Sequence, residues 1–354
     1  MSILIFIIIL AILVLVHEFG HFIAAKRQGV KVEEFGFGFP PRLFGWKIGE
    51  TIYSINLIPL GGFVKLFGEE YHEIKKKSKI SSRAFVNKKP WQKALIVIAG
   101  VVGNFLLGWV LISFLFTQGV PVPTNKVIVE GVSSSSPAHD AGLKKGDVVK
   151  QIAINDKQYK LSSATDLINL SKKFSGQELI ITVLRENKEL SLNIIPRINP
   201  PAGEGPLGVT ITSFAEKKFP WYSAPLLGLI ESFNITKNIV LELSKIFVQL
   251  LTFQKPTAQI AGPIGIVQFT SQAIKFGKNA VLELVALLSF NLAIINILPF
   301  PALDGGRLVF VLYEWISKKP SPKTIEKYAN LVGFIILVTI ALLISVNDII
   351  RMYR

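Results

Sequence analysis

Four long apolar runs, separated by polar segments, dominate the sequence. They occupy residues 3–25, 94–116, 281–298 and, together with its flanks, 331–346. A helix rises 1.5 Å per residue, so about 20 apolar residues are needed to cross the roughly 30 Å hydrocarbon core of a bilayer. The pattern therefore predicts an α-helical integral membrane protein with four transmembrane helices.

A cleaved signal peptide is the alternative interpretation of the first run. No basic residues precede it, and the polar stretch HEFGH at residues 17–21 stands where a small-residue cleavage site would be expected. We therefore expect the first run to remain in the protein as a membrane span.

Composition and charge agree with a membrane protein. Half of the 354 residues are hydrophobic and 18% are charged, whereas soluble proteins carry about 25% charged residues. The net charge of +15 is interleaved with apolar runs and lacks the aromatic and basic clustering of a nucleic-acid site, so an anionic membrane surface is the simpler partner. The absence of cysteine excludes disulfides, thiolate metal ligands and cysteine nucleophiles, and leaves the redox state of the compartment open.

Basic residues in the shorter loops set the expected orientation. Residues 26–93 contain more basic than acidic side chains, including KKKSK at 75–79, and the loop after the third run carries Arg307, Lys318, Lys319 and Lys323. The positive-inside rule places both loops in the cytoplasm. Both termini and residues 119–280 are then extracytoplasmic, in a multi-pass protein of the cell inner (cytoplasmic) membrane.

The first cytoplasmic loop contains a β-hairpin signal. TIYSINLI is followed by PLGGFVKLF, and the alternation around Gly61 and Gly62 predicts two strands with a turn at the glycines. The apolar stretch FGFGFPPRLFGW precedes them and would allow the hairpin to enter the membrane interface. A plain cytoplasmic hairpin fits the pattern equally well.

The long extracytoplasmic segment divides into two parts. Strand-like runs and turns, with one helical patch at TDLINLSKKF, fill residues 124–198 and predict a small α+β module. Farther on, apolar residues recur at helical spacing over residues 221–252, which predicts an amphipathic helix on the membrane surface or against a partner protein.

Six segments therefore describe the expected organisation. They are the first transmembrane helix with HEFGH (1–25), a cytoplasmic loop with a membrane-associated β-hairpin (26–93), the second transmembrane helix (94–118), the inserted module (119–212), an amphipathic membrane-surface region (213–280), and the third and fourth transmembrane helices (281–354).

HEFGH places metal-binding chemistry inside the first span. Positions i and i+4 share one helix face, so His17 and His21 can hold one metal ion, and Glu18 beside them can act on a water molecule. This is the HExxH arrangement of zinc hydrolases. Ionisable residues are costly in a bilayer, so their presence within a span points to function.

A catalytic zinc usually takes a third protein ligand. His72 and His139 are candidates by residue type, but the spans favour Asp304, the first acidic residue after the third apolar run. At 1.5 Å per residue, His17 lies about 21 Å along the first span and the third span reaches Leu298 after about 25 Å, so these residues can meet. The alternative is that Asp304 merely caps the following helix.

These motifs resemble the site-2 protease family of intramembrane zinc metalloproteases, specifically its bacterial RseP-type group. The resemblance is carried by HEFGH in the first span, GVVGNF in the second and NILPFPALDGG after the third. SSPAHDAGLKKGDVVKQIAIND is similar to a PDZ domain, and GPLGVTI at 205–211 to its carboxylate-binding strand and loop in permuted order. The resemblance covers nearly the whole chain, with one PDZ-like module where the best-known relatives have two.

The resemblance implies roles for individual residues. His17, His21 and Asp304 would bind Zn²⁺, with Glu18 as the general base. Asn291 and Asn296 would contact the substrate. A hairpin at residues 51–67, which includes Ile55, Leu57, Gly61 and Gly62, would pair with an unwound substrate strand.

The implied activity is regulated intramembrane proteolysis. The expected substrates are single-span membrane proteins, such as pre-trimmed anti-sigma factors and remnant signal peptides. The expected partners are these transmembrane helices, the lipid bilayer and, at the PDZ-like module, peptide C-termini, with no nucleic acid.

Three other hypotheses compete with this one. A metal transporter would also place histidine and aspartate in the membrane, but would give Glu18 no necessary role. A membrane scaffold built on the PDZ-like module would need no metal. HExxH proteases of other families typically take a glutamate from a later helix as third ligand, whereas this chain offers Asp304.

Overall fold

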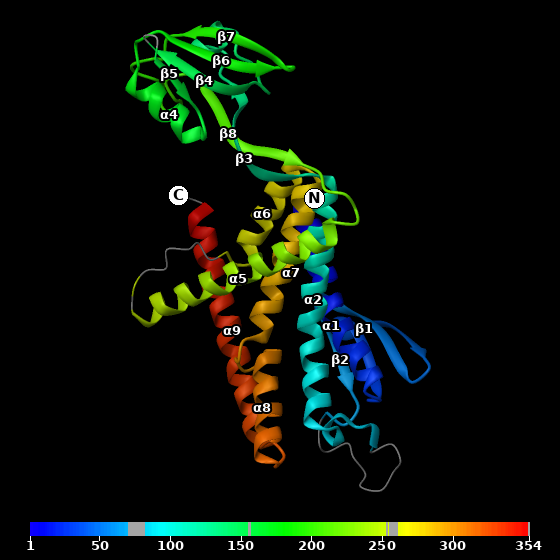
Figure 1. The fold of residues 1–354 in the computed structure, drawn as a ribbon. Coiled ribbons are helices and arrows are strands. Elements are labelled where there is room, and N and C mark those ends of the chain that lie inside the picture. The colour runs from blue at the N-terminus through cyan, green and yellow to red at the C-terminus, as the bar shows by residue number, and fades with distance from the viewer. Residues whose placement is uncertain (70–81, 155–156, 253, 255–260, 353–354) are drawn as a thin grey trace. The chain divides into compact units, whose positions relative to one another are not determined.

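The computed structural model of the protein describes residues 1–69, 82–154, 157–252, 254 and 261–352 (Figure 1). The chain forms two compact units. One contains Met1–Thr117 together with Pro220–Arg354, and the other contains Gln118–Phe219. The predicted cluster KKKSK and His72 lie outside the described residues.

Four helices of the first unit are long and apolar enough to cross a membrane. They are α1 (Ser2–Arg27), α2 (Pro90–Gln118), α7 (Lys278–Ile297) and α9 (Lys323–Met352). The four predicted spans are therefore confirmed as helices. α9 extends well beyond the predicted 331–346, because charged and polar residues in its first and last turns interrupt the apolar pattern without interrupting the helix.

Shorter helices complete this unit. The predicted helix at 221–252 is present as α5 (Ala224–Leu251), while η3 (Phe85–Asn87), α6 (Pro263–Phe276) and α8 (Asp304–Ser317) were not separated by the sequence analysis. α6 packs against α1, α7 and α9. Its first turn is held by Asp348 of α9, whose Oδ2 accepts the N–H groups of Gly262 and Gly265, both at 2.9 Å.

The predicted hairpin within residues 51–67 is wrong in its pairing. Strands β1 (Val32–Ile48) and β2 (Thr51–Leu66) pair with each other, and residues 32–39 lie between the two halves of β2. Gly36, for example, is opposite both Ser54 and Phe63. The short turn lies at 49–50, and the glycines of 61–62 redirect β2 to the far side of β1, so FVKLF pairs with β1 and not with TIYSINLI.

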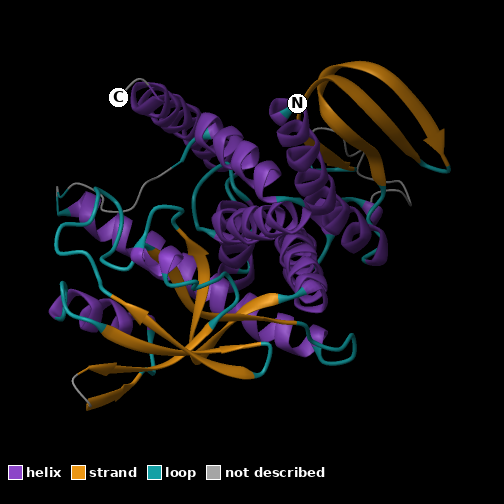
Figure 2. Ribbon diagram, turned by 90° about the horizontal axis from the view of Figure 1, so that it is seen from above, coloured by secondary structure: helices purple, strands orange, loops and turns teal. Residues whose placement is uncertain are grey.

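The second unit is a small α+β fold, as the alternation predicted. Its sheet has the order β7-β6-β4-β3-β8, with β5 paired to β4; both sheets of the chain appear as orange strands in Figure 2. The strands and helices are β3 (Val120–Val132), α3 (Pro137–Asp140), β4 (Val148–Ile154), β5 (Lys157–Lys160), α4 (Ala164–Lys173), β6 (Leu179–Arg185), β7 (Lys188–Ile194) and β8 (Val209–Lys217).

A buried ion pair stabilises this unit beside its apolar core. The Asp147 side chain is 1% exposed, and Arg185 donates to both of its carboxylate oxygens, from Nε at 2.7 Å and from Nη2 at 2.6 Å. Burial alone would raise the pKa of the Asp147 carboxyl, but the hydrogen bonds from Arg185 and from the Lys144 N–H outweigh it and lower the pKa.

Glu50 joins three segments of the first unit. It follows β1, accepts hydrogen bonds from Arg83 at 2.8 and 2.6 Å, and pairs with Lys26 of α1 at 3.1 Å. The hydrogen bonds from Arg83 are the main cause that lowers the pKa of the Glu50 carboxyl to about 2. This cluster fixes the turn between β1 and β2 to the end of α1.

Glu50→Gln should therefore destabilise the protein in a pH-dependent way. The unfolded carboxyl titrates near 4.3, so the stabilisation is complete above that pH and is lost as the pH falls toward about 2. Unfolding midpoints in detergent should differ between wild type and variant at pH 7, and the difference should narrow below about pH 4. Glu130→Gln, the same chemical change on an exposed strand position, is the control. A difference that persists unchanged to pH 2 would contradict the assignment.

Candidate metal centre

Helices α1 and α2 approach each other closely because glycines line their contact. A Cβ on Gly20 would collide with the Ala99 carbonyl, and a Cβ on Gly103 would lie 2.9 Å from the Val16 carbonyl oxygen. Small residues at such positions let two backbones meet within a membrane. As a result His21 of α1 reaches α2, where its Nδ1 lies 2.8 Å from the Ile96 carbonyl oxygen.

Asp304 reaches the same region from a tight connection between α7 and α8. A Cβ on Gly305 would collide with the carbonyls of Leu298 and Ile297, so the glycine after Asp304 permits this close turn. Ala302 takes a φ of 72°, and its N–H donates to Asn330 Oδ1 at 3.1 Å. Asp304 is the first residue of α8, and the N-cap position is Leu303 without a side-chain cap. The helix-cap interpretation of Asp304 is therefore wrong.

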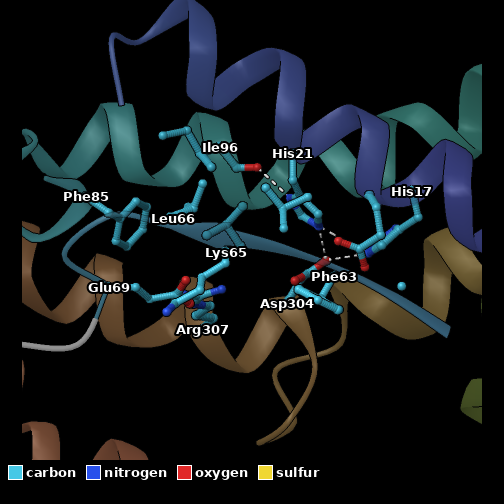
Figure 3. Close-up of a pocket in the computed structure, with 14 residues that line it drawn as sticks. His17, His21, Phe63, Lys65, Leu66, Glu69, Phe85, Ile96, Asp304 and Arg307 are labelled. Carbon is cyan, nitrogen blue, oxygen red and sulfur yellow. Dashed lines mark hydrogen bonds and ion pairs between the residues drawn. The ribbon is translucent and has the colours of Figure 1, made fainter. Parts of the chain in front are cut away.

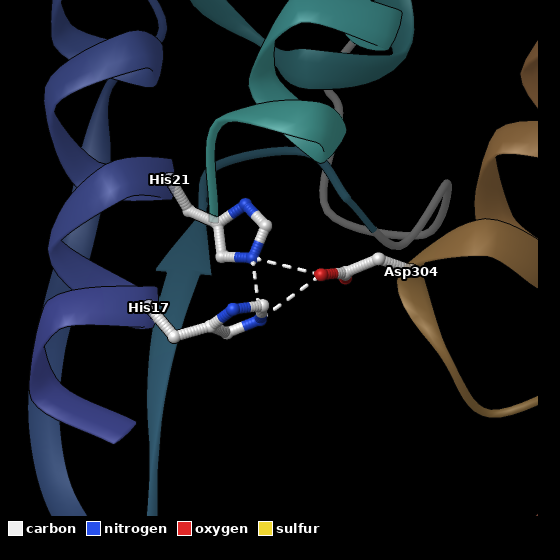
Figure 4. A group of neighbouring side chains, drawn as sticks. All are labelled: His17, His21 and Asp304. Carbon is white, nitrogen blue, oxygen red and sulfur yellow. Dashed lines mark hydrogen bonds and ion pairs between the residues drawn. The ribbon is translucent and has the colours of Figure 1, made fainter. Parts of the chain in front are cut away.

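The three predicted ligands converge. His17 and His21 project from successive turns of α1, and Asp304 faces them from α8 (Figure 4). His17 Nε2 and His21 Nε2 are 3.2 Å apart, and Asp304 Oδ2 lies 3.0 Å from the first and 3.2 Å from the second. Their side chains are only 12%, 13% and 16% exposed.

This geometry fits a zinc ion. Zinc binds nitrogen and oxygen at about 2.0–2.2 Å, so two ligands of a tetrahedral site lie roughly 3.3–3.5 Å apart. The three separations are within about 0.4 Å of that value, and the donor set of two imidazoles and one carboxylate is one that zinc favours. Among the described residues this is the group of histidine and acidic side chains that could hold a metal.

A cavity of about 550 Å³ opens beside these residues (Figure 3). Glu18 lines it together with the three candidate ligands and residues 62–66 of β2. Gly62 is packed against Glu18, since a Cβ there would lie 3.1 Å from Glu18 Cγ. Glu18 and the candidate metal ligands thus line the same cavity, as they must if Glu18 acts on a metal-bound water in an HExxH site.

Ion pairs that the sequence analysis did not identify surround α8. Arg307, one turn after Asp304, lines the cavity, pairs with Glu69 and lies over the Phe85 ring. Lys93 of α2 pairs with Glu314 at 2.7 Å, with the two side chains 7% and 10% exposed. The helical spacing of Arg307 from Asp304 was the available signal, but its charge was interpreted only as a marker of orientation.

The remaining predicted site residues lie apart from the cavity. Its lining includes Gly62 but none of Ile55, Leu57, Gly61, Asn291 and Asn296. The Asn291 side chain donates to the Leu287 carbonyl at 2.9 Å within its own helix. The substrate roles of these residues stay predictions. His139, the other ligand candidate by type, is on α3 of the second unit.

Comparisons with known proteins decide the family. The model of peptidase family M50 matches residues 5–340. The chain belongs to peptidase family M50, the site-2 proteases. It is 30% identical to the regulator of sigma-W protease RasP of Bacillus subtilis over 98% of both chains. It is 35% identical to a putative zinc metalloprotease of Clostridium perfringens over 96% of this chain and 95% of that protein.

Membership of peptidase family M50 resolves the competing hypotheses. The chain is a multi-pass membrane protein and a site-2-type zinc metalloprotease that acts within the membrane, with zinc as its cofactor. The transporter, the scaffold and an HExxH protease of another family are thereby excluded. A further relative, a putative zinc metalloprotease of a Nostoc species, is 33% identical over 98% of this chain and 96% of its own length.

Gly100→Ala should weaken zinc binding in this M50 peptidase. A Cβ at Gly100 would touch the His21 ring nitrogen and lie 2.8 Å from His17 Cε1, so both imidazoles must shift. We expect zinc affinity to fall by at least about 10-fold, as displaced ligand geometry commonly does. Competition with a chromogenic chelator measures it. Gly131→Ala is the control, because its Cβ meets only Thr210 atoms at 3.8 Å. Unaltered affinity in Gly100→Ala would place the zinc away from these rings.

Proposed function

We propose that His17, His21 and Asp304 bind the catalytic zinc and that Glu18 is the general base for peptide hydrolysis. The observation that carries the proposal is the 3.0–3.2 Å convergence of one atom from each of the three residues, with Glu18 in the adjoining cavity. Two helices from opposite ends of the sequence supply the ligands, and a third, α2, orients one of them through the Ile96 carbonyl.

Each residue has a defined chemical part. Bound zinc supplies Lewis acidity, which polarises the scissile carbonyl and lowers the pKa of water toward neutrality. Glu18 accepts the proton of the attacking water and returns it to the leaving amine. The small exposed fraction of the two histidines and Asp304 limits competing water around them.

Residues 62–66 offer a strand edge for the substrate. A transmembrane helix conceals its carbonyls in hydrogen bonds, so it must unwind before cleavage, and pairing with a strand replaces the lost bonds. Within the described chain, residues 62–66 pair with β1 on one side only, and they line the cavity with Glu18. The inner residues Ile55 and Leu57 are 41% and 55% exposed, so their side chains remain available to an apolar segment.

The proposed substrate class is supported by this strand edge and by the relatives. We propose single-span membrane proteins, such as pre-trimmed anti-sigma factors, and remnant signal peptides as substrates. The Bacillus relative is named a regulator of sigma-W protease, which supports the first group. Asn291 and Asn296 on α7 are proposed to contact the substrate as it leaves the helical state.

The unit Gln118–Phe219 is proposed to be a PDZ-like module on the extracytoplasmic side. Its buried Asp147 follows the glycine of the predicted GD turn, and GPLGVTI leads into β8. Peptide C-termini are the ligands this fold would take at such a strand. In the same orientation α5 lies along the membrane surface, and both termini are extracytoplasmic.

Two substitutions test the zinc site. Glu18→Gln should keep zinc but lower cleavage of a transmembrane peptide by about 100- to 10,000-fold, because the ligands remain and the proton acceptor is lost. Asp304→Ala should weaken zinc binding by more than the roughly 10- to 100-fold that follows loss of a residue that only orients a ligand. Its activity should fall as well. Metal analysis and a cleavage assay on the same purified samples separate the two. Full zinc affinity in Asp304→Ala, or normal cleavage by Glu18→Gln, would refute the assignment.

The proposed orientation is tested with single cysteines, since the chain has none of its own. A cysteine at Lys157 should react with a membrane-impermeant maleimide in intact cells, whereas one at Lys319 should react only after permeabilisation. Both should react in detergent, which controls for accessibility. Labelling of Lys319→Cys in intact cells would show that the proposed orientation is wrong, and the zinc-site proposal would still stand.

A further inference from the structure

Asn104, in the GVVGNF stretch of α2, is a polar side chain buried without a partner. The residue is 0% exposed, and neither its Oδ1 nor its Nδ2 has a hydrogen-bonding partner among the described residues. Its backbone carbonyl accepts a hydrogen bond from Ser289 Oγ of α7 at 2.7 Å. Buried polar groups are nearly always hydrogen-bonded, so an amide at this position calls for an explanation.

His17 has a buried ring nitrogen that lacks a hydrogen-bonding partner among the described residues. Its Nε2 faces Asp304 and His21, so in the proposed zinc site this nitrogen supplies the lone pair, and the proton of the neutral ring is on Nδ1. Nδ1 is buried and has no hydrogen-bonding partner in the described part of the chain. Histidines that bind metals almost always donate their second N–H to an acceptor. His21 has such an acceptor in the Ile96 carbonyl, 2.8 Å away.

The register of α1 against α2 places Asn104 and His17 at neighbouring levels of the helix contact. Gly20 lies against Ala99 and Val16 against Gly103, so the two helices run in opposite directions at this contact. Gly100 faces both imidazole rings, and Asn104 follows one turn later on the same face of α2.

Side-chain direction then brings the Asn104 amide back toward the rings. Helical side chains lean toward the N-terminus of their own helix, which directs the amide over the Gly100 turn. Gly100 has no side chain to occupy that space. On α1 the neighbouring level belongs to His17, because the antiparallel register pairs later residues of α2 with earlier residues of α1.

We propose that Asn104 is a positioning residue for His17, whose Nδ1–H it accepts through Oδ1, directly or by way of one buried water. The inference rests on the proposed zinc site and adds a residue that orients one of its ligands. Asn104 would fix the tautomer and orientation of His17, as the Ile96 carbonyl does for His21.

Three variants of the full-length protein test the proposal through zinc affinity. Asn104→Leu is similar in size but lacks the acceptor, so its zinc dissociation constant should rise by about 10- to 100-fold. Asn104→Asp keeps an oxygen at the same place and should stay within a few-fold of wild type. Ser289→Ala removes the 2.7 Å hydrogen bond to the backbone of Asn104 but leaves the amide, so it is the matched control. Chelator competition gives the affinities, and the visible spectrum of the cobalt-substituted protein should change in Asn104→Leu alone.

A His17→Ala background shows whether the effect passes through His17. At zinc concentrations high enough to load the weakened His17→Ala site, Asn104→Leu should not weaken zinc binding further, because the ring that it orients is absent. An equal loss in both backgrounds would overturn the proposal. So would wild-type zinc affinity in Asn104→Leu, or losses of the same size in Asn104→Leu and Asn104→Asp.

Failure of the zinc site itself gives a different result. If His17→Ala binds zinc as tightly as the wild type, the proposed site is wrong, and the role of Asn104 falls with it. If His17→Ala loses zinc but Asn104→Leu does not, only the role of Asn104 is refuted. Should Asn104→Leu not fold, Asn104→Ala takes its place under the same criteria.

Discussion

The candidate metal centre depends on the closeness of α1 and α2. Lipid tails are as apolar as leucine, so helices in a membrane associate through close packing and polar contacts, which small residues at the interface permit. Gly20 and Gly103 lack the side chains that would hold the two backbones apart. The space left by Gly100 holds the imidazole rings, and the short distance lets His21 use a backbone carbonyl of α2. Helix packing and ligand geometry are therefore set by the same contacts.

Paired charges hold α8 where Asp304 can meet the histidines. Lys93 and Glu314 are nearly buried, and the other oxygen of Glu314 accepts the Ser321 N–H at 3.1 Å. Near the other end of α8, Arg307 pairs with Glu69. Buried ion pairs add little net stability, because desolvation offsets their attraction, but removal of one partner is costly. Their contribution here is to allow one orientation of α8 and to disfavour others.

The sequence predicted the membrane spans and the candidate metal ligands more fully than it predicted which strands pair. Apolar runs located α1, α2, α7 and α9, because the bilayer imposes length and hydropathy on any span. HEFGH identified both histidines, since i and i+4 share a face whatever the rest of the fold does. The third candidate ligand needed a depth argument across distant spans, and the structure brings Asp304, the first acid beyond the third apolar run, next to both histidines.

Other features depend on contacts that no local pattern encodes. Residues 32–39 pair with both halves of β2 and so lie between them. The alternation of apolar and polar residues does not specify which strands pair, and it is equally compatible with a local hairpin. The acceptors of Lys93 and Arg307 come from distant segments, so neither residue differs in sequence from an ordinary cytoplasmic basic residue. The first turn of α6 is stabilised by Asp348, far along the chain, which accepts the N–H groups of Gly262 and Gly265.

The distance in sequence between HEFGH and Asp304 has a consequence for biosynthesis. The two histidines enter the membrane with the first span, while Asp304 follows almost the whole of the remaining chain. At roughly 5–20 residues per second, tens of seconds pass before the ribosome has made the aspartate. During that time the nascent chain has Glu18 and both imidazoles but lacks the carboxylate that would complete the proposed site. With the proposed ligands, this peptidase would gain a complete zinc site only when its own synthesis is nearly finished.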